Sequence, residues 1–190
     1  MKPIAPIPFK ADFSKPLDFL FHCHQKIAAN LEALRRATAD LHTAQREDLA
    51  TVAETINGVL THLSSSGKKH TRDEEESLFP RLRQHKDRGS DEIFEVLGQL
   101  ESQHKRAASI ERSLTNMALA LAIADEIGSE KIALFNDLSE SLYDLYRPHI
   151  QIENEFIFPA SAQILTEAEL AAAGHEMFQR RQLKIKPLNG

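Results

Sequence analysis

Two segments of the chain, HTRDEEESLFP at residues 70–80 and HIQIENEFIFP at residues 149–159, share one pattern. Aligned without gaps, each has histidine at its first position, glutamate at its fifth and seventh, and Phe-Pro at its end. A histidine followed four residues later by a glutamate places both on one helix face, because four steps of about 100° overshoot a turn by only about 40°. Two such pairs on facing helices bring two imidazoles and two carboxylates to one point. That inventory is typical of a dinuclear transition-metal site in a helical bundle.

Two further helical patterns each carry one histidine within an apolar stripe. Apolar residues recur at steps of three and four in residues 17–34 and again in residues 93–114, which is the pattern of one helix face. His24 and His104 lie within these two stripes. The separation from each of them to the following His-x-x-x-Glu is similar, 46 residues in the first half and 45 in the second. The chain therefore has the pattern of a helix pair that occurs twice.

This periodicity predicts an all-α protein, an up-down-up-down four-helix bundle with a short C-terminal helix. Short connections make neighbouring long helices antiparallel. Thr166, with Glu169 three residues later, has the pattern of a capping box that starts the last helix. The helices are expected over residues 16–41, 45–85, 90–125, from 129 to at least 157, and 167–181.

The chain is predicted to hold one bundle domain at residues 15–165. An extended, proline-rich lead-in at residues 1–14 precedes it, and a short helix with a tail at residues 166–190 follows it. Within the second long helix, Ser-Ser-Ser-Gly at residues 64–67 has low helix propensity, and we expect a continuous but irregular helix there. Pro80 cannot donate a backbone hydrogen bond and predicts a bend or a new turn.

Composition excludes several classes of protein. The 190 residues are 42% hydrophobic and 27% charged, which is typical of one globular domain and not of a disordered chain. The net charge of −5 and the lack of a long basic run argue against a nucleic-acid partner, and no apolar stretch is long enough to span a membrane. Cys23 is the single cysteine, so an intrachain disulfide is excluded. We expect a cytoplasmic protein.

The candidate ligands comprise four imidazoles and two carboxylates, which suit iron, manganese or zinc better than magnesium or calcium. If both carboxylates bridge, two metal ions share them and take two histidines each. The remaining coordination positions can hold an oxo or hydroxo bridge and a molecule such as dioxygen or nitric oxide. We expect two iron ions, because redox chemistry gives those positions a use. The candidate ligands are His24, His70, Glu74, His104, His149 and Glu153.

Other polar residues near the repeats have a weaker claim to the site. Glu76 and Glu155 lie off the ligand face, and we interpret them as structural residues or as outer hydrogen-bond partners of the ligands. Tyr146, three residues before His149, is a candidate hydrogen-bond donor to the site. The five remaining histidines lack a partner at ligand spacing and are interpreted as surface or core residues: His22, His42, His62, His85 and His175.

These motifs resemble the hemerythrin-like, HHE cation-binding family, in its stand-alone bacterial form. The resemblance spans residues 16–181 and implies a four-helix bundle that holds a non-haem di-iron centre. Members of that family bind dioxygen or nitric oxide, sense oxygen or iron, or repair damaged iron centres. The segments that carry the resemblance are CHQKI at residues 23–27, the two repeats, Gln103-His104, and GHEM with the arginine pair at residues 174–181.

One departure from the family narrows the expected function. Invertebrate hemerythrins use five histidines, two of them on the third helix, whereas Leu100 and Ala108 lie four residues either side of His104 here. A fifth imidazole is therefore missing, which argues against reversible oxygen carriage of the hemerythrin kind. The extra cysteine-bearing N-terminal domain of the iron-sulfur repair members is also absent from this sequence.

Three functions remain open from the sequence. The first is a di-iron protein that binds, senses or detoxifies dioxygen, nitric oxide or peroxide. The second is a di-iron enzyme or a factor that repairs iron-sulfur centres, which rests on analogy alone. The third is an interaction module in which the metal site is structural and Arg180-Arg181 docks a partner. The sequence leaves the oligomeric state open.

Overall fold

The computed structural model describes residues 12–41, 49–122 and 128–182. Within these ranges the chain is helical apart from short connections and has no strand, so the all-α prediction is confirmed. The elements are α1 (Pro16–Asp40), α2 (Leu49–His62), π-helical η1 (Leu63–Gly67), α3 (Lys68–Asp73), π-helical η2 (Glu74–Leu78), α4 (Phe79–Gln84), α5 (Asp91–Ala122), α6 (Ser129–Ile152), π-helical η3 (Glu153–Ile157), α7 (Phe158–Ile164) and α8 (Glu167–Gln182).

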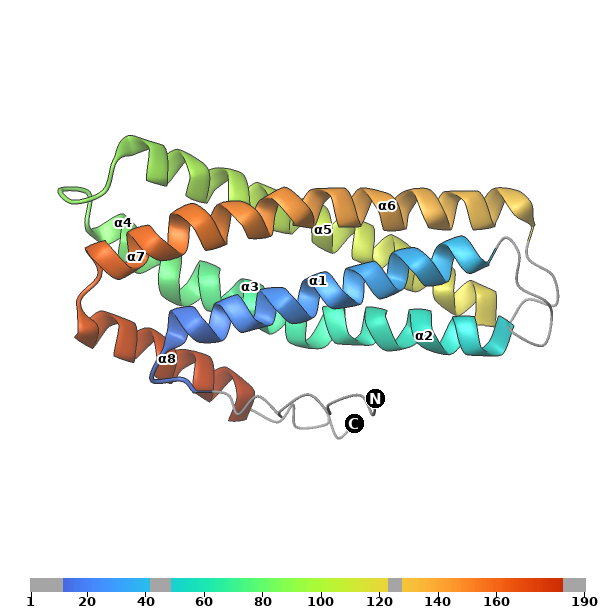
Figure 1. Ribbon diagram of the computed structural model, residues 1–190, viewed down its shortest axis with the longest axis horizontal. Coiled ribbons are helices and arrows are strands. Elements are labelled where there is room, and N and C mark those ends of the chain that lie inside the picture. Colours follow the sequence, from blue (N-terminus) through green and yellow to red (C-terminus); the bar gives the residue numbers. More distant parts are fainter. Residues whose placement is uncertain (1–11, 42–48, 123–127, 183–190) are drawn as a thin grey trace, which may run out of the picture.

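The elements form four long helical stretches, which are α1, α2 through α4, α5, and α6 through α7. Each of α1 and α5 packs against both α2 and α6, and Figure 1 shows the four stretches side by side along the longest axis of the molecule. The colours run in one direction along α1 and α5 and in the other along α2 and α6 (Figure 1). The short helix α8 lies against α1 and α3 at one end. The lead-in predicted for residues 1–14 falls mostly outside the described residues.

Two apolar clusters fill the bundle, and a polar layer separates them. One cluster holds residues from Ile27 to Leu41 of the first stretch, and the other holds Phe19 and Leu20 of the same helix. The other three stretches divide in the same way, and in each of them the buried histidine or glutamate lies between the two clusters in sequence. The candidate ligands are therefore enclosed by apolar packing from both ends of the bundle. No helix among the described residues is both long and apolar enough to cross a membrane.

The two repeats end in the same backbone irregularity. In η2 the N–H of Phe79 donates to the carbonyl of Glu74, five residues back, and in η3 the N–H of Phe158 donates to the carbonyl of Glu153. A proline one residue later follows in both copies, and its ring cannot be accommodated against the carbonyl four residues back in a regular helix. The wider turn resolves that clash. Each candidate ligand glutamate therefore begins a π-helical turn, where the sequence predicted a bend after the first repeat.

The serine-rich segment and the last helix behave as the sequence predicts. Residues 64–67 lie in η1, so the second stretch is continuous and irregular there. The capping box of α8 forms, because the N–H of Thr166 donates to Glu169 Oε2 at 2.8 Å and the N–H of Glu169 donates to Thr166 Oγ1 at 3.3 Å.

A close approach of two segments holds α8 in place and gives a testable prediction. A Cβ atom on Gly174 would lie 2.0 Å from the carbonyl oxygen of Phe13. We expect Gly174→Ala to lower the free energy of unfolding by about 1–3 kcal/mol, because α8 or the segment before α1 must shift. The measurement is urea denaturation followed by circular dichroism.

The matched control is Gly98→Ala within α5, where a Cβ atom would meet nothing within 4 Å. This variant should raise the free energy of unfolding by up to about 1 kcal/mol, because alanine is the better helix former. Equal changes of the same sign in the two variants would show that the contact at Gly174 does not hold α8.

Candidate metal centre

All six candidate ligands lie in the polar layer, and every one of the four long stretches contributes at least one. All are buried, with at most 5% of any of the six exposed. Each of these histidines and glutamates lies on the inward face of its helix, in register with the apolar residues. The helical spacing predicted them for this reason. They are His24 of α1, His70 of α3, Glu74 of η2, His104 of α5, His149 of α6 and Glu153 of η3.

The four imidazoles form two pairs. The ring centroids of His24 and His70 are 4.7 Å apart, and those of His104 and His149 are also 4.7 Å apart. In the second pair the two Nε2 atoms are separated by 3.0 Å. Two nitrogen atoms that face each other so closely are arranged to share one proton or one metal ion.

The two carboxylates lie between the imidazole pairs. Glu74 Oε1 is 3.1 Å from His70 Nε2 and 3.5 Å from His24 Nε2, while its Oε2 is 3.5 Å from His104 Nε2. Glu153 Oε2 is 3.0 Å from His24 Nε2 and 3.3 Å from His149 Nε2. Each glutamate therefore contacts at least one histidine from each pair, which is the disposition of a bridging carboxylate.

The polar atoms at the centre lack hydrogen bonds within the protein. Both carboxylate oxygens of Glu74, both of Glu153, and Nε2 of His24 are buried and have no hydrogen-bond partner among the described residues. Burying a carboxylate without a partner costs several kcal/mol. The short distances above thus join atoms that point to a common centre and not along hydrogen bonds. This donor set fits a transition-metal ion, which would satisfy these atoms together.

Three of the four histidines are held from behind by an oxygen on another helical stretch. The Nδ1–H of His24 donates to Asn154 Oδ1 at 2.7 Å, and the Nδ1–H of His104 donates to Glu75 Oε1 at 2.9 Å. The Nδ1–H of His149 donates to the Oε1 atom of Gln103 at 2.8 Å. Such acceptors fix the proton on Nδ1 and leave the lone pair of Nε2 for a metal.

Sequence analysis missed these outer partners, although the repeat contains a signal for two of them. Glu75 and Asn154 occupy the same position of the two repeats, one residue after the ligand glutamate. The seventh-position glutamates, which were the candidates for this role, are structural. Glu76 accepts hydrogen bonds from Arg72 and Arg180, and the exposed Glu155 accepts from the neighbouring Gln151.

Comparison with known proteins agrees with this geometry. The family model of the hemerythrin HHE cation binding domain matches residues 15–174 of the chain. The chain belongs to the hemerythrin HHE family. No curated protein matches it. The HHE assignment accounts for the clustered histidines and glutamates as a site that can hold a cation.

Protons occupy this HHE site when no cation does. Burial opposes a charge on His24, but the carboxylates of Glu153 and Glu74 outweigh burial and raise the pKa of this imidazole to about 10. Burial, followed by the charge of Glu153, raises the pKa of Glu74 well above its usual value. Burial and the neighbouring His24 hold the pKa of His70 well below the usual range, so its ring is neutral.

Metal binding is therefore expected to release protons. At pH 7 a metal ion must displace the proton of His24, so about one proton per chain should be released. Metal affinity should fall as the pH falls. In the metal-free protein the charge on His24 contributes stability that is complete below pH 6.5 and is lost as the pH rises through about 10.

The measurement is calorimetric titration with Zn²⁺ in two buffers whose ionisation enthalpies differ. The observed heats should differ in proportion to the number of protons released. Identical heats in the two buffers would contradict the protonation state that we assign to the metal-free site.

Tyr146 was a candidate hydrogen-bond donor to the metal site, but its hydroxyl bonds to another residue. Its hydroxyl donates to Glu111 Oε1 at 3.3 Å, and its ring meets that of His149 edge-on at 5.7 Å between centroids. Burial raises the pKa of Glu111, and burial together with Glu111 raises that of Tyr146 well above its usual value. Tyr146 thus packs against one candidate ligand but donates its hydrogen bond to a glutamate two turns beyond His104.

Two cavities approach the centre from different sides. One, of about 540 Å³, lies between the second stretch and α5 and is lined by Glu75, His104, Glu111 and Tyr146, among others. The other, of about 270 Å³, lies between α1, the second stretch and α8 and is lined by His70 and Cys23, among others. Burial raises the pKa of the Cys23 thiol to about 11, so this group is protonated at neutral pH.

Proposed function

We propose that the protein is a non-haem di-iron protein that binds, senses or detoxifies dioxygen, nitric oxide or peroxide. The observation that carries this proposal is the arrangement of two imidazole pairs around two carboxylates that contact both pairs. Each ion would have two histidines and a share of both glutamates, which leaves coordination positions for a small ligand. Bound iron would supply redox chemistry at those positions.

The rest of the chain supports binding of a small ligand. Apolar clusters on both sides of the polar layer exclude bulk water, which strengthens electrostatic interactions within the layer. The cavity of about 540 Å³ reaches His104 and gives a small molecule a route to the centre. A fixed proton on Nδ1 of three histidines keeps their Nε2 atoms available for a metal.

The test is anaerobic addition of ferrous iron, removal of unbound metal, and exposure to air or to nitric oxide. We expect about two irons per chain and a near-ultraviolet or visible absorption band that appears only with iron and the gas together. Zinc-loaded protein is the matched control and should give no band. An iron content well below about two per chain, or an unchanged spectrum, would contradict the proposal.

A catalytic form of this function, the turnover of peroxide, is favoured by one specific observation. Glu111 lines the same cavity as His104, and burial keeps its carboxyl protonated towards higher pH than usual. A protonated carboxyl beside the hydroxyl of Tyr146 can donate a proton to a ligand in that cavity. Glu111→Gln should then slow peroxide consumption by about 10²-fold or more and leave the iron content unchanged. Glu130→Gln, on the exposed start of α6, should change neither the rate nor the iron content. Equal rates in the two variants would leave ligand binding alone as the function.

A further inference from the structure

One of the four candidate histidine ligands lacks the outer partner that the other three have. Asn154, Glu75 and Gln103 each accept a hydrogen bond from the Nδ1 atom of one histidine. His70 is equally buried, but its Nδ1 atom has no hydrogen-bond partner among the described residues. Nε2 of His70 is turned to Glu74, on the side of the candidate metal centre. When this nitrogen binds a metal, a neutral ring carries its proton on Nδ1, and a buried donor without an acceptor is rare in folded proteins.

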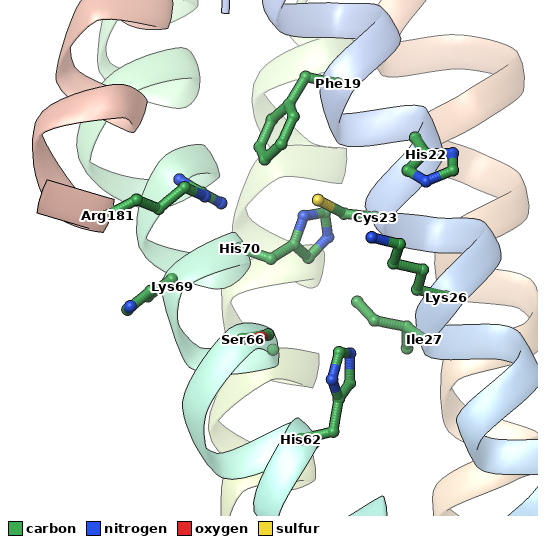
Figure 2. Close-up of a pocket in the computed structure, with 11 residues that line it drawn as sticks. Phe19, His22, Cys23, Lys26, Ile27, His62, Ser66, Lys69, His70 and Arg181 are labelled. Carbon is green, nitrogen blue, oxygen red and sulfur yellow. The ribbon is translucent and has the colours of Figure 1, made fainter. Parts of the chain in front are cut away.

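His70 lines the cavity of about 270 Å³. Figure 2 shows His70 in its centre, with side chains from α1, the second stretch and α8 around it. The side chains of Lys26 and Arg181 extend towards the His70 ring from α1 and α8 (Figure 2). Lys69 also lines the cavity, and no aspartate or glutamate does so among the described residues. The charged lining is therefore basic.

The basic lining is partly preorganised. Arg181 donates from Nη2 to Asp73 Oδ2 at 2.6 Å and from Nη1 to the carbonyl of Met177 at 2.7 Å. Its guanidinium also lies over the ring of Phe19, 4.4 Å from the centroid. A guanidinium has five N–H donors, so Arg181 can hold this position and still donate into the cavity. A fixed cation loses little conformational entropy when an anion binds.

We propose that this cavity binds a small inorganic oxyanion, which accepts a hydrogen bond from Nδ1 of His70 and acts as the missing fourth outer partner of the metal centre. The inference rests on the metal centre of the proposed function but not on its gas chemistry. The basic lining selects an anion over a neutral molecule. The volume is several times the roughly 30 Å³ share of one water molecule, which leaves room for an oxyanion.

The proposal implies that the oxyanion and the metal bind cooperatively. An acceptor on Nδ1 raises the basicity of the ligand nitrogen, and loss of such a partner typically weakens metal binding by about 10–100-fold. Saturating oxyanion should therefore raise the Zn²⁺ affinity by at least about 10-fold. By reciprocity, Zn²⁺ should raise the affinity for the oxyanion by the same factor.

The test titrates phosphate, sulfate, nitrate and bicarbonate, at constant ionic strength with chloride as the reference, into metal-free and Zn²⁺-loaded protein. The readouts are the dissociation constant of each anion and the ¹⁵N shift of His70 Nδ1. We expect at least one oxyanion to move that shift in both forms of the protein and to bind the Zn²⁺-loaded form more tightly. No His70 shift with any of the four anions would overturn the proposal.

A pair of variants separates this site from direct binding of the anion to the metal. Lys26→Met removes one charge from the exposed rim of the cavity and should weaken oxyanion binding by about 10-fold. Lys131→Met, exposed at the start of α6, is the matched control and should leave binding unchanged. Equal affinity in the two variants would place the anion elsewhere and overturn the proposal. Because iron and gas are absent, failure here is distinguishable from failure of the proposed function.

Discussion

Glu153→Gln is expected to reduce the bound metal from about two ions per chain to a background level. Oε2 of Glu153 lies 3.0 Å from His24 Nε2 and 3.3 Å from His149 Nε2, and Glu153 belongs to both groups of side chains that could hold an ion. Glutamine has the same shape, but it is neutral and has one acceptor oxygen. The exchange therefore removes the negative charge that both ions would share, together with one of the two oxygen atoms that could bind them. The measurement is metal analysis after dialysis against metal-free buffer.

The control for this prediction comes from the same repeat. Glu155 is exposed and accepts hydrogen bonds from Gln151 within its own stretch, so Glu155→Gln should retain the full metal content. Far-ultraviolet circular dichroism of both variants checks that the helices remain. A Glu153→Gln variant with intact helices and an unchanged metal content would contradict the bridging role of this carboxylate.

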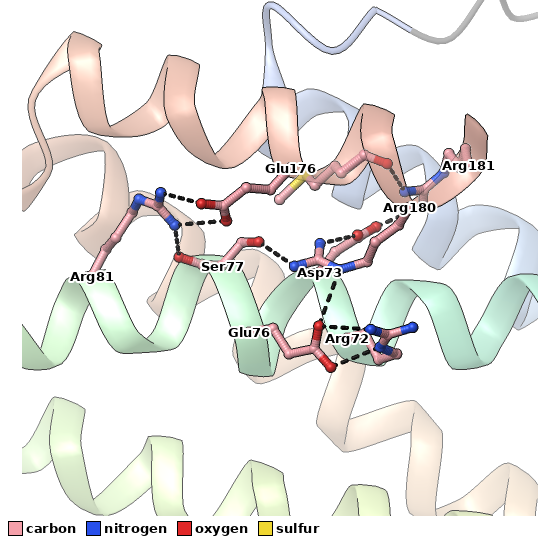
Figure 3. A network of polar contacts seen from close by, with 9 residues as sticks. Arg72, Asp73, Glu76, Ser77, Arg81, Glu176, Arg180 and Arg181 are labelled. Carbon is pink, nitrogen blue, oxygen red and sulfur yellow. Dashed lines mark hydrogen bonds and ion pairs between the residues drawn. The ribbon is translucent and has the colours of Figure 1, made fainter. Parts of the chain in front are cut away.

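Arg180→Gln is expected to lower the free energy of unfolding by about 3 kcal/mol. The side chain of Asp73 is completely buried and accepts from Arg180 Nη1 at 2.7 Å and from Arg181 Nη2 at 2.6 Å, as Figure 3 shows. Burial raises the pKa of this carboxyl while the two guanidiniums lower it, so the charge on Asp73 depends on both arginines. Removing one arginine leaves a buried carboxylate with half of its compensation, and it also removes the bond from Arg180 to Ser77 Oγ.

The size of this effect should depend on exposure and on pH. Arg35→Gln is the matched control, because about a third of each side chain is exposed in the pair of Arg35 with Glu32. Loss of such an exposed pair should cost at most about 1 kcal/mol.

The raised pKa of Asp73 means that protonation of this carboxyl favours the folded state. The penalty of Arg180→Gln should therefore be complete above the folded pKa and should fall, below the unfolded value of 3.8, to the part that the lost bond to Ser77 contributes.

A double-mutant cycle by urea denaturation assigns the effect to the pair. In the Arg180→Gln background, Asp73→Asn should cost less than it does in the wild type, because the amide no longer leaves Arg180 unpaired. Additive changes would show that Asp73 and Arg180 do not interact. Since Asp73 directly precedes Glu74, this network also anchors the start of η2 to α8.

The sequence was sufficient to predict that the six candidate ligands lie close together, because helical spacing alone determines which face a residue occupies. His70 with Glu74 and His149 with Glu153 are each four residues apart, so any helix brings each pair together. The apolar stripes then identified His24 and His104, since a stripe must face the core. The structure brings all six side chains together, as the spacing predicted.

The repeat marks Glu75 and Asn154 as equivalent positions, but which histidine each of them contacts could not be predicted, because that depends on how each helix is rotated about its own axis. The bonds from His24 to Asn154 and from His149 to Gln103 join residues 130 and 46 positions apart, and periodicity does not specify such contacts. The hydroxyl of Tyr146 was misassigned for a related reason, because its partner Glu111 lies on another helix. The π-helical turns were foreseen only as a bend at Pro80, since a proline excludes a regular helix without specifying its replacement.

The most direct measurement of the central claim is anomalous X-ray diffraction at the iron edge from crystals of the iron-loaded protein. Two anomalous peaks are expected in each chain, one beside His24 and His70 and the other beside His104 and His149, with the carboxylates of Glu74 and Glu153 contacting both. A single peak, peaks outside the polar layer, or imidazoles turned away from the metal would contradict a dinuclear centre built from these six side chains.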